Sequence, residues 1–416
     1  MLSDVGAKSQ GFPLAMRCYR RMMTSTLPAR GNPLAYRDPE SFQAHAQGLD
    51  LTFHPQGSAR LRALLDLIDD ARVSLKVCFY IFATDYTGQK VRDALQKAAE
   101  RGVAVTLLVD GFGAEADEAF FAGFIKAGGD FRVFSPRWSR RYLIRNHQKI
   151  LLVDGRKAML GGFNIENSYF APPRDNGWND LGVTIEGPVV DPIGEWFARL
   201  EEWTGNPKAQ WRVIRRMVRQ WDGGSGPVRV LVGGPTRGLS SWAHAVGRDL
   251  QRANRIDMVM AYFSPSPRLR KRLRRIARKG EARLILAGKS DNTATIAASR
   301  ALYRKLLDAG AAIYEFQPCK LHTKLIVLDD VVYLGSANFD MRSLYINLEI
   351  VLRIEDAGLA EQLREFIDHY CPASERVTKQ AHEKRATFFN RIRWWASWFL
   401  VSVVDYTVSR RLNLGQ

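Results

Sequence analysis

The sequence lacks the features that identify several common classes of protein. Only four cysteines occur in 416 residues, and no two of them form a CxxC pair. This scatter favours buried, reduced thiols over a disulfide framework or a zinc site. The chain also contains no HExxH motif and no cluster of acidic residues, so we expect neither a metal nor a cofactor. The cysteines are Cys18, Cys78, Cys319 and Cys371.

Long apolar runs are also missing. No segment reaches the roughly 18–20 apolar residues that a membrane-spanning helix needs, and the N-terminus does not have the pattern of a signal peptide. The segment Trp394–Val404, WWASWFLVSVV, comes closest, with Arg391 and Arg393 before it and Arg410 and Arg411 after it. Tryptophan and arginine around a short apolar stretch favour a helix lying in the headgroup region of a membrane. The alternative is a C-terminal helix that packs on the protein's own core.

Acidic residues are too few to balance the basic ones. The chain has 61 Lys and Arg against 43 Asp and Glu, which gives a net charge of +18. Such an excess indicates a polyanionic partner, either nucleic acid or an anionic membrane surface. The hydrophobic fraction of 46% and the charged fraction of 25% are those of a folded globular protein, and the length suffices for two domains.

The most informative feature is a pattern, His-x-Lys-x-x-x-x-Asp, that occurs twice. Each copy is followed by a glycine-containing turn that ends in Asn, and this agreement downstream is hard to attribute to chance. Two histidines and two lysines suffice for a nucleophile, a general acid and a clamp on phosphate oxygens. The first copy is His147, Lys149 and Asp154 with Asn164, and the second is His322, Lys324 and Asp329 with Ser336 and Asn338.

The segments before the two patterns also correspond, which indicates a duplicated unit. The apolar runs 75–82 and 256–263 are short enough for buried strands, and a helical pattern and a second strand follow each of them. This order predicts two similar α/β domains with largely parallel strands. We expect an N-terminal extension (1–48), a first domain (49–205), a basic linker (206–227), a second domain (228–372) and an amphipathic tail (373–416).

The alternation of side chains along a strand predicts how the residues of each pattern are oriented. Lys149 lies two residues after His147, so both side chains project from the same face of a strand. Asp154 precedes Gly155 between two apolar runs, which is a hairpin signal, so a turn is the alternative to a catalytic role for this aspartate.

A phosphoryl-transfer chemistry follows from these side chains. Neutral imidazole can attack phosphorus to form a covalent intermediate, while the second imidazole donates and then removes a proton. A carboxylate that accepts from Nδ1–H would orient each ring, and Asp180 and Glu349 follow the two patterns at similar places. We expect the non-bridging phosphate oxygens to be held by Lys149, Lys324, Asn164 and Asn338.

These motifs resemble those of a known family. HQKILLVD with GGFN, and HTKLIVLD with GSANFDMRS, are similar to the paired HKD motifs of the phospholipase D superfamily. From Leu51 to Tyr370 the context, including WNDLGVTIEGP, resembles bacterial cardiolipin synthases of the short type without N-terminal membrane helices. The resemblance implies two phospholipase D-like α/β domains, with mixed sheets flanked by helices, that form one shared active site. It also implies His147 as the nucleophile and His322 as the general acid. Gly162 departs from the pattern where the second motif has Ser336, so a hydroxyl contact to the phosphate is expected only from Ser336.

The activity implied by the resemblance is the transfer of a phosphatidyl group between phospholipids. Phosphatidylglycerol would be donor and acceptor, with phosphatidylethanolamine as a further candidate substrate, at the cytoplasmic face of a bacterial inner membrane. Hydrolysis of phospholipids and cleavage of nucleic acid are the alternatives within the superfamily. The charge favours nucleic acid, but the apolar tail and the context of both motifs favour lipid. The sequence carries no signal for an oligomeric state.

Overall fold

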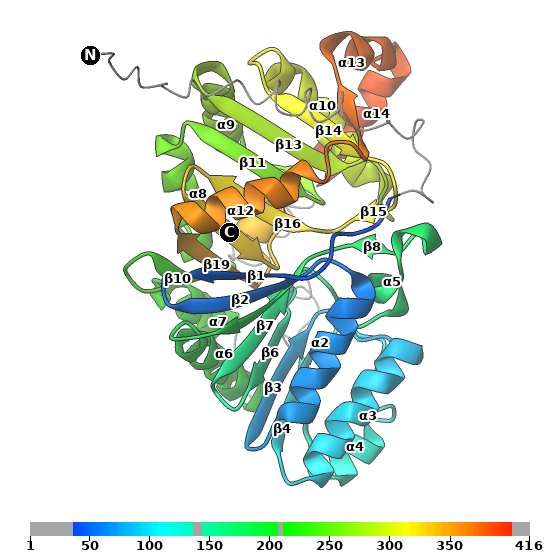
Figure 1. The fold of residues 1–416 in the computed structure, drawn as a ribbon, viewed down its shortest axis with the longest axis vertical. Coiled ribbons are helices and arrows are strands. Elements are labelled where there is room, and N and C mark those ends of the chain that lie inside the picture. The colour runs from blue at the N-terminus through cyan, green and yellow to red at the C-terminus, as the bar shows by residue number, and fades with distance from the viewer. Residues whose placement is uncertain (1–35, 136–143, 207–210, 402–416) are drawn as a thin grey trace, which may run out of the picture.

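The computed structural model describes residues 36–135, 144–206 and 211–401. It contains two α/β units, which lie one above the other in Figure 1, and each is built on a mixed eight-stranded sheet. The prediction of two similar α/β domains is therefore confirmed.

The first unit has the strand order β1-β2-β9-β7-β6-β3-β4-β5. Alternate residues of its central strands face opposite sides, so that Val77 packs against α2 and α3 while Cys78 faces the second unit. Its strands are β1 (Phe42–Ala46), β2 (Leu49–His54), β3 (Ser74–Phe79), β4 (Ala104–Asp110), β5 (Asp130–Phe134), β6 (Ile150–Val153), β7 (Lys157–Gly161) and β9 (Gly182–Glu186). Its helices are α2 (Gly57–Asp70), α3 (Tyr86–Glu100), α4 (Ala122–Lys126), α5 (Asn167–Phe170) and α6 (Val190–Gly205).

The second unit repeats this order as β10-β19-β17-β16-β11-β13-β14-β20. One face of its sheet is covered by α8, α9 and α10, and the other packs with α12 and α6 in a core shared with the first unit. Its strands are β10 (Val228–Gly233), β11 (Arg255–Met260), β13 (Glu281–Ala287), β14 (Ala312–Phe316), β16 (Lys324–Leu328), β17 (Val331–Gly335), β19 (Glu349–Glu355) and β20 (Ser374–Val377). Its helices are α8 (Ser241–Arg252), α9 (Pro267–Lys279), α10 (Thr293–Leu307), α11 (Met341–Tyr345) and α12 (Ala357–Asp368).

The expectation of largely parallel strands was too strong. Among the described strands of the two large sheets, parallel pairing joins β3 to β4, β4 to β5, β11 to β13 and β13 to β14, whereas the other neighbours run antiparallel. The reason is that hairpins such as β6–β7 and β16–β17 extend each sheet, and a short turn can join only antiparallel strands.

The boundaries of the two units in the structure also differ from the predicted ones. Strand β1 pairs with β2 at the edge of the first sheet, so this unit begins before residue 49. Strand β20 pairs with β14, so the second unit extends beyond residue 372. The predicted basic linker contains α7 (Trp211–Gln220), which buries Trp211, Ile214 and Val218.

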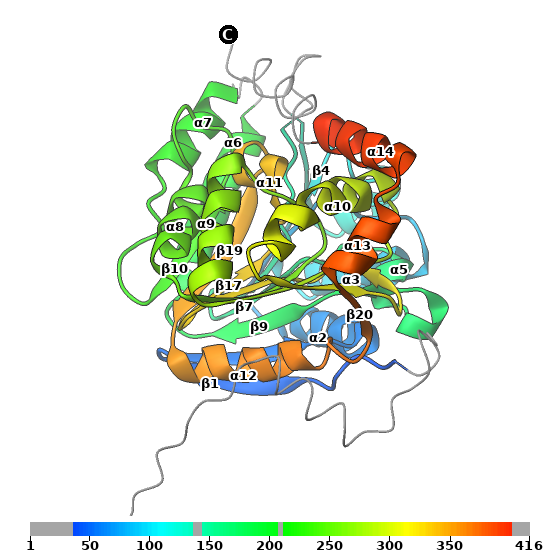
Figure 2. The ribbon, with the colours of Figure 1, turned by 90° about the horizontal axis from the view of Figure 1, so that it is seen from above.

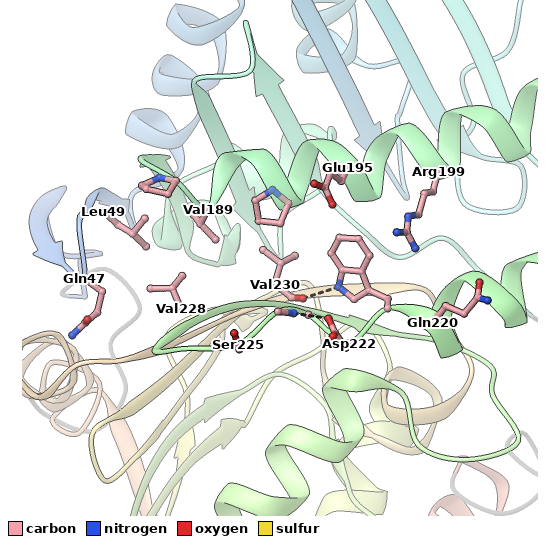
Figure 3. A pocket seen from close by; sticks show the side chains of 15 residues that line it. Gln47, Leu49, Val189, Glu195, Arg199, Gln220, Asp222, Ser225, Val228 and Val230 are labelled. Atoms are coloured by element: carbon pink, nitrogen blue, oxygen red, sulfur yellow. Dashed lines mark hydrogen bonds between the residues drawn. The ribbon is translucent and has the colours of Figure 1, made fainter.

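A pocket of about 380 Å³ lies where the linker meets α6 and β10 (Figure 3). The indole of Trp221 donates to the carbonyl of Val230 at 2.7 Å, and the guanidinium of Arg199 lies 5.0 Å from the ring centre. These contacts attach the linker to a helix of the first unit and a strand of the second.

The C-terminal segment packs in part on the protein itself, which is the alternative interpretation given above, whereas its binding to a membrane stays a prediction. After α13 (Lys379–Arg385), helix α14 (Phe388–Phe399) packs on α10, and Trp394 is buried with its ring stacked on His382 at 5.2 Å. The opposite side of α14 is exposed. Residues 402–416 lie outside the described residues. Of the helices that the structure describes, none is long and apolar enough to cross a membrane.

Two short parallel pairings join the units at their centre. In the first, β15 (Lys320–Leu321) pairs with β8 (Trp178–Asn179), and in the second, Asn146 pairs with Leu348. Each joins the residues just before a histidine of one unit to the residues just before a carboxylate of the other.

Candidate active site

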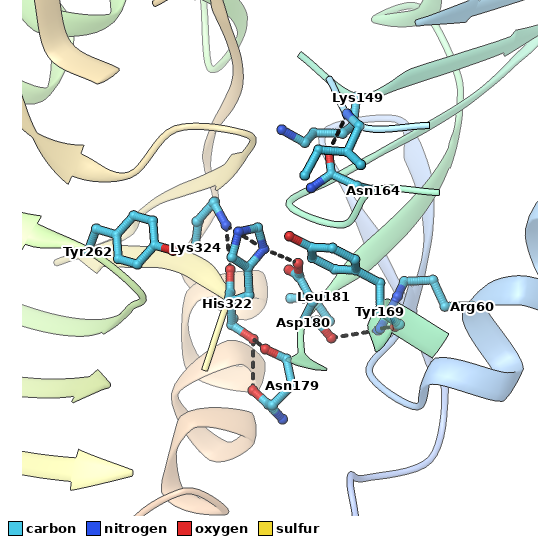
Figure 4. A network of polar contacts seen from close by, with 12 residues as sticks. Arg60, Lys149, Asn164, Tyr169, Asn179, Asp180, Leu181, Tyr262, His322 and Lys324 are labelled. Carbon is cyan, nitrogen blue, oxygen red and sulfur yellow. Dashed lines mark hydrogen bonds and ion pairs between the residues drawn. The ribbon is translucent and has the colours of Figure 1, made fainter. Parts of the chain in front are cut away.

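The structure brings the histidine and lysine of both motifs to one place between the units. The Nζ atom of Lys149 donates to the carbonyl of His147 at 2.7 Å, and Nζ of Lys324 donates to that of His322 at 2.5 Å. Figure 4 shows Lys149 on one side of the site and His322 and Lys324 on the other. The expectation that both motifs face a shared site agrees with this geometry.

Each histidine is held by a carboxylate from the opposite unit. Nδ1 of His147 lies 3.1 Å from Oε2 of Glu349, and Nδ1 of His322 lies 2.6 Å from Oδ2 of Asp180. The backbone pairing sets this crossing, because His322 N–H donates to the carbonyl of Asn179 and His147 N–H to that of Leu348. The sequence indicated these two carboxylates but not that they are exchanged between the units. With Nδ1 engaged, Nε2 is the nitrogen left for a substrate.

Burial keeps both imidazoles neutral. Burial and the nearby ammonium of Lys149 hold the pKa of His147 well below its usual range. Burial and the ammonium of Lys324 lower the pKa of His322 to about 3, although Asp180 opposes this. Either ring is therefore available as a neutral nucleophile before the substrate binds.

The two carboxylates differ in their charge state. Burial would raise the pKa of Asp180, but the charges of Lys324 and Arg60 and the hydrogen bond with His322 hold it below its usual value. Burial raises the pKa of Glu349 to about 7, although Lys149 opposes this. The centre at His322 therefore has a permanent anion beside it, whereas the centre at His147 has a carboxylate that titrates near neutrality.

The asparagines of the two turns lie at the site. Oδ1 of Asn164 accepts from the N–H of Ile81 at 3.2 Å, and the Asn164 side chain also forms a hydrogen bond with Tyr169. Within the described part of the chain, Oδ1 of Asn338 is buried without a hydrogen-bond partner. A buried polar atom without a hydrogen-bond partner destabilises the fold unless a ligand or a water molecule supplies that hydrogen bond. Both side chains remain candidates for holding phosphate oxygens.

Ser336 has a different task from the predicted phosphate contact. Its hydroxyl donates to Oε2 of Glu349 at 2.5 Å and accepts from the N–H of Ile350 at 3.1 Å, so it orients the carboxylate. At the corresponding Gly162, a Cβ would lie 2.6 Å from Oδ1 of Asp180. The shorter aspartate thus needs glycine beside it, which explains the departure between the two motifs.

Asp154 and Asp329 are turn residues, and this corrects their assignment to the catalytic group. Both adopt left-handed backbone conformations, with φ of 52° and 46°, at the ends of the β6–β7 and β16–β17 hairpins remote from the site. The carboxylate of Asp154 accepts from the N–H groups of Arg72, Val73 and Ser74. The carboxylate of Asp329 accepts in the same way from the N–H groups of Asn254 and Arg255, where β11 begins.

Several residues at the site were not predicted from the sequence. Arg60 is fully buried and donates to the carbonyls of Asp180 and Tyr169, among others, so it fixes the segment that carries the carboxylate. The rings of Tyr169 and Trp178 each lie 5.1 Å from the ring centre of His322. The sequence offered only a weak signal for Arg60, namely that it lies on the same buried face of α2 as Leu64.

Within residues 36–135, 144–206 and 211–401, no three His, Cys, Asp or Glu side chains are grouped so that they could hold a metal ion.

Comparison with known proteins identifies the family. The family model described as "Cardiolipin synthase, PLD-like domain" matches residues 64–201 and 248–371. The chain belongs to this family. A cardiolipin synthase 1 of Bacillus anthracis is 30% identical over 79% of this chain and 68% of its own. A cardiolipin synthase of Clostridium perfringens is 27% identical over 82% of this chain and 74% of its own.

Solved structures agree on the fold of this family member. The phosphatidylserine synthase of Haemophilus influenzae Rd KW20 superposes with a TM-score of 0.68 at 13% identity, over 95% of this chain and 99% of that one. The polyphosphate kinase of Porphyromonas gingivalis gives a TM-score of 0.56 at 15% identity, over 81% of this chain and 49% of that one. At these identities the likeness concerns the fold alone.

The role of Asp154 can be tested by substitution. We expect Asp154→Ala to lower the free energy of unfolding by about 1–2 kcal/mol, because three N–H groups lose their acceptor and alanine disfavours a positive φ. Activity per folded molecule should stay close to that of the wild type. Chemical denaturation and initial rates measure the two effects, and Lys149→Ala is the inactive control. A folded Asp154→Ala protein with a rate reduced a hundredfold would restore the catalytic assignment.

The buried lysines predict an alkaline limit to activity. Burial lowers the pKa of Lys149 to about 7 and that of Lys324 to about 8, so their positive charges are lost as the pH rises through this range. We expect kcat/KM, which reports the free enzyme, to fall above pH 7–8. Bound phosphate favours the ammonium forms, so the profile of kcat should fall at higher pH. A kcat/KM that stays constant up to pH 9 would contradict this account.

Proposed function

We propose that the protein is a cardiolipin synthase that transfers a phosphatidyl group from one phosphatidylglycerol to another and releases glycerol. The observation that carries the proposal is the pair of crossed histidine–carboxylate contacts beside two lysines. This group supplies a nucleophile, an acid–base catalyst and positive charge for the phosphate oxygens. Family membership indicates the enzyme class, a phosphatidyltransferase.

In the first step, Nε2 of His147 attacks phosphorus and the bond from phosphorus to the glycerol oxygen breaks. His322 takes up a proton from the solvent as the anionic phosphodiester binds, and it gives this proton to that oxygen. In the second step, the hydroxyl of the acceptor returns a proton to His322 while its oxygen attacks phosphorus and the bond to His147 breaks. Lys149, Lys324 and Asn164 stabilise the charge on the non-bridging oxygens in both steps.

The assignment of the two histidines rests on their carboxylates. An imidazolium is stabilised by a carboxylate that stays ionised, and Asp180 meets this need beside His322 at 2.6 Å. Glu349 is only partly ionised near neutral pH, which suits a ring that acts as a neutral nucleophile. The resemblance of the motifs to the superfamily supports the same order.

Access to lipid is supported by the surface of α14. Its exposed side carries large apolar residues together with Arg391 and Arg393, a combination that suits the interface of an anionic membrane. In Figure 2, α14 and the basic α7 lie at the same edge of the view, opposite β1 and α12. We propose peripheral binding at the cytoplasmic face of a bacterial inner membrane. The exposed apolar residues are Phe388, Phe389, Ile392, Trp395, Phe399 and Leu400.

A product analysis tests the activity. With vesicles of phosphatidylglycerol as the sole lipid, we expect cardiolipin and glycerol to exceed phosphatidic acid, and EDTA to leave the rate unchanged. His147→Ala should abolish both products, and His322→Ala should slow both steps by about 10²–10⁴-fold. Mass spectrometry of the lipids measures the outcome.

Three results would contradict the proposal in different ways. Phosphatidic acid as the dominant product at every glycerol concentration would make the protein a hydrolase. Faster cleavage of single-stranded DNA than of any lipid would favour a nuclease. Label from the phosphatidyl group that stays bound to the His147→Ala protein after rapid denaturation would place the nucleophile elsewhere.

The membrane surface is tested separately. Replacing Phe388, Phe389 and Trp395 by Ser should reduce binding to anionic vesicles more than about tenfold, because each large apolar side chain contributes roughly 1.5–3 kcal/mol when fully buried. The melting temperature should not fall, because Trp394 still packs on His382. Ile125→Ser, which removes an exposed apolar residue from α4, is the matched control. Unchanged vesicle sedimentation would contradict the proposal.

A further inference from the structure

The acceptor in the proposed reaction differs from the leaving group by one anionic charge. The leaving glycerol is neutral, whereas an acceptor phosphatidylglycerol brings its own phosphodiester beyond the attacking hydroxyl. Both occupy the His322 side of the reacting phosphorus, because His322 protonates one oxygen and deprotonates the other. A synthase therefore needs a second anion-binding group on this side, at a distance set by the three-carbon glycerol bridge.

Lys320 lies at the required place. It precedes His322 by two residues on an extended segment, so Lys320, His322 and Lys324 project from the same face. The ammonium of Lys320 lies 4.5 Å from the ring centre of Trp178, and the same ring lies 5.1 Å from that of His322. Trp178 thus holds the lysine beside the acid–base histidine without neutralising its charge.

A second lysine lies beside this segment. The loop after β13 carries Lys289, whose carbonyl accepts from the N–H of Leu321 at 3.4 Å and whose Nζ donates to the carbonyl of Pro318 at 3.3 Å. Both lysines are partly exposed. Two ammonium groups are therefore available where β15 reaches the surface.

The first motif has a different arrangement at the matching position. Arg145 precedes His147 by two residues, but its guanidinium donates to the hydroxyl of Tyr80 at 3.1 Å and lies 4.1 Å from the ring centre of Phe112. This cation lies on the nucleophile side, opposite the incoming alcohol. The two ends of the site are therefore both basic, and only the one at Lys320 lies where the acceptor must arrive.

We propose that Lys320, with Lys289 beside it, binds the phosphodiester of the acceptor lipid and so directs the phosphatidyl-enzyme toward a phospholipid. This proposal rests on the proposed function and adds the residue that selects the acceptor. Lys320 acts only in the second step, because the neutral glycerol that leaves in the first step carries no phosphate for it to bind.

The partition of the phosphatidyl-enzyme between acceptors tests this role. With phosphatidylglycerol vesicles, Lys320→Gln should lower the ratio of cardiolipin to phosphatidic acid about tenfold, which corresponds to about 1.4 kcal/mol. Transfer to ethanol, a neutral acceptor, should stay unchanged, and so should the rate of glycerol release in a single turnover. Lys320→Arg should restore most of the ratio, because it keeps the charge over Trp178.

Lys97→Gln is the matched control. It removes an exposed lysine from the last turn of α3, at the end of the first sheet away from the site. An unchanged product ratio in Lys320→Gln, while the wild type makes cardiolipin, would overturn the subsite alone. Equal losses with ethanol and with phosphatidylglycerol would also overturn it, because they indicate a structural role. If Lys320→Gln does not fold, Lys320→Met and Lys289→Gln make the same comparison. A wild type that yields only phosphatidic acid would instead overturn the proposed function.

Discussion

The exchange of carboxylates between the units is the constraint on which the rest of the site depends. Two imidazoles and two ammonium groups are buried together, and buried charges are tolerated only when they are paired and hydrogen-bonded. Asp180 and Glu349 supply that compensation, each to the histidine of the opposite unit. Neither unit alone can therefore present an oriented histidine, and the shared core that holds the two sheets together is part of the catalytic apparatus.

This shared environment also separates the tasks of two nearly identical motifs. Ser336 and Ser343 donate to the longer carboxylate of Glu349, whereas Gly162 leaves room for the shorter Asp180 close to Lys324. Each histidine lies beside a lysine and a carboxylate, but the two carboxylates differ in charge near neutral pH. In the proposed mechanism, these small differences in side-chain length let one copy of a duplicated motif supply the nucleophile and the other the proton carrier.

Much of the fold could be read from local patterns. The strands at 75–82 and 256–263 and the hairpin at Asp154-Gly155 follow from apolar runs and turn residues, and the structure has them close to where they are expected. The sheet partners could not be read in this way, because pairing between distant segments depends on packing that no local pattern records. For that reason parallel pairing was overestimated and β1 and β20 were left outside their sheets.

The candidate site, too, could be predicted from the sequence only in part. Histidine, lysine and asparagine positions follow from spacing along one strand, whereas the roles of Asp154 and Ser336 depend on which groups lie opposite them in space. Arg60 was missed because an arginine in an amphipathic helix reads as a surface residue until its carbonyl partners are known.

The linker that runs through α7 has a consequence for how the site comes together. Because both halves belong to one polypeptide, the encounter between them is intramolecular and has a fixed effective concentration. Two separate subunits with the same crossed contacts would lose their oriented histidines on dilution. A fused chain keeps the two halves of its site together at any concentration.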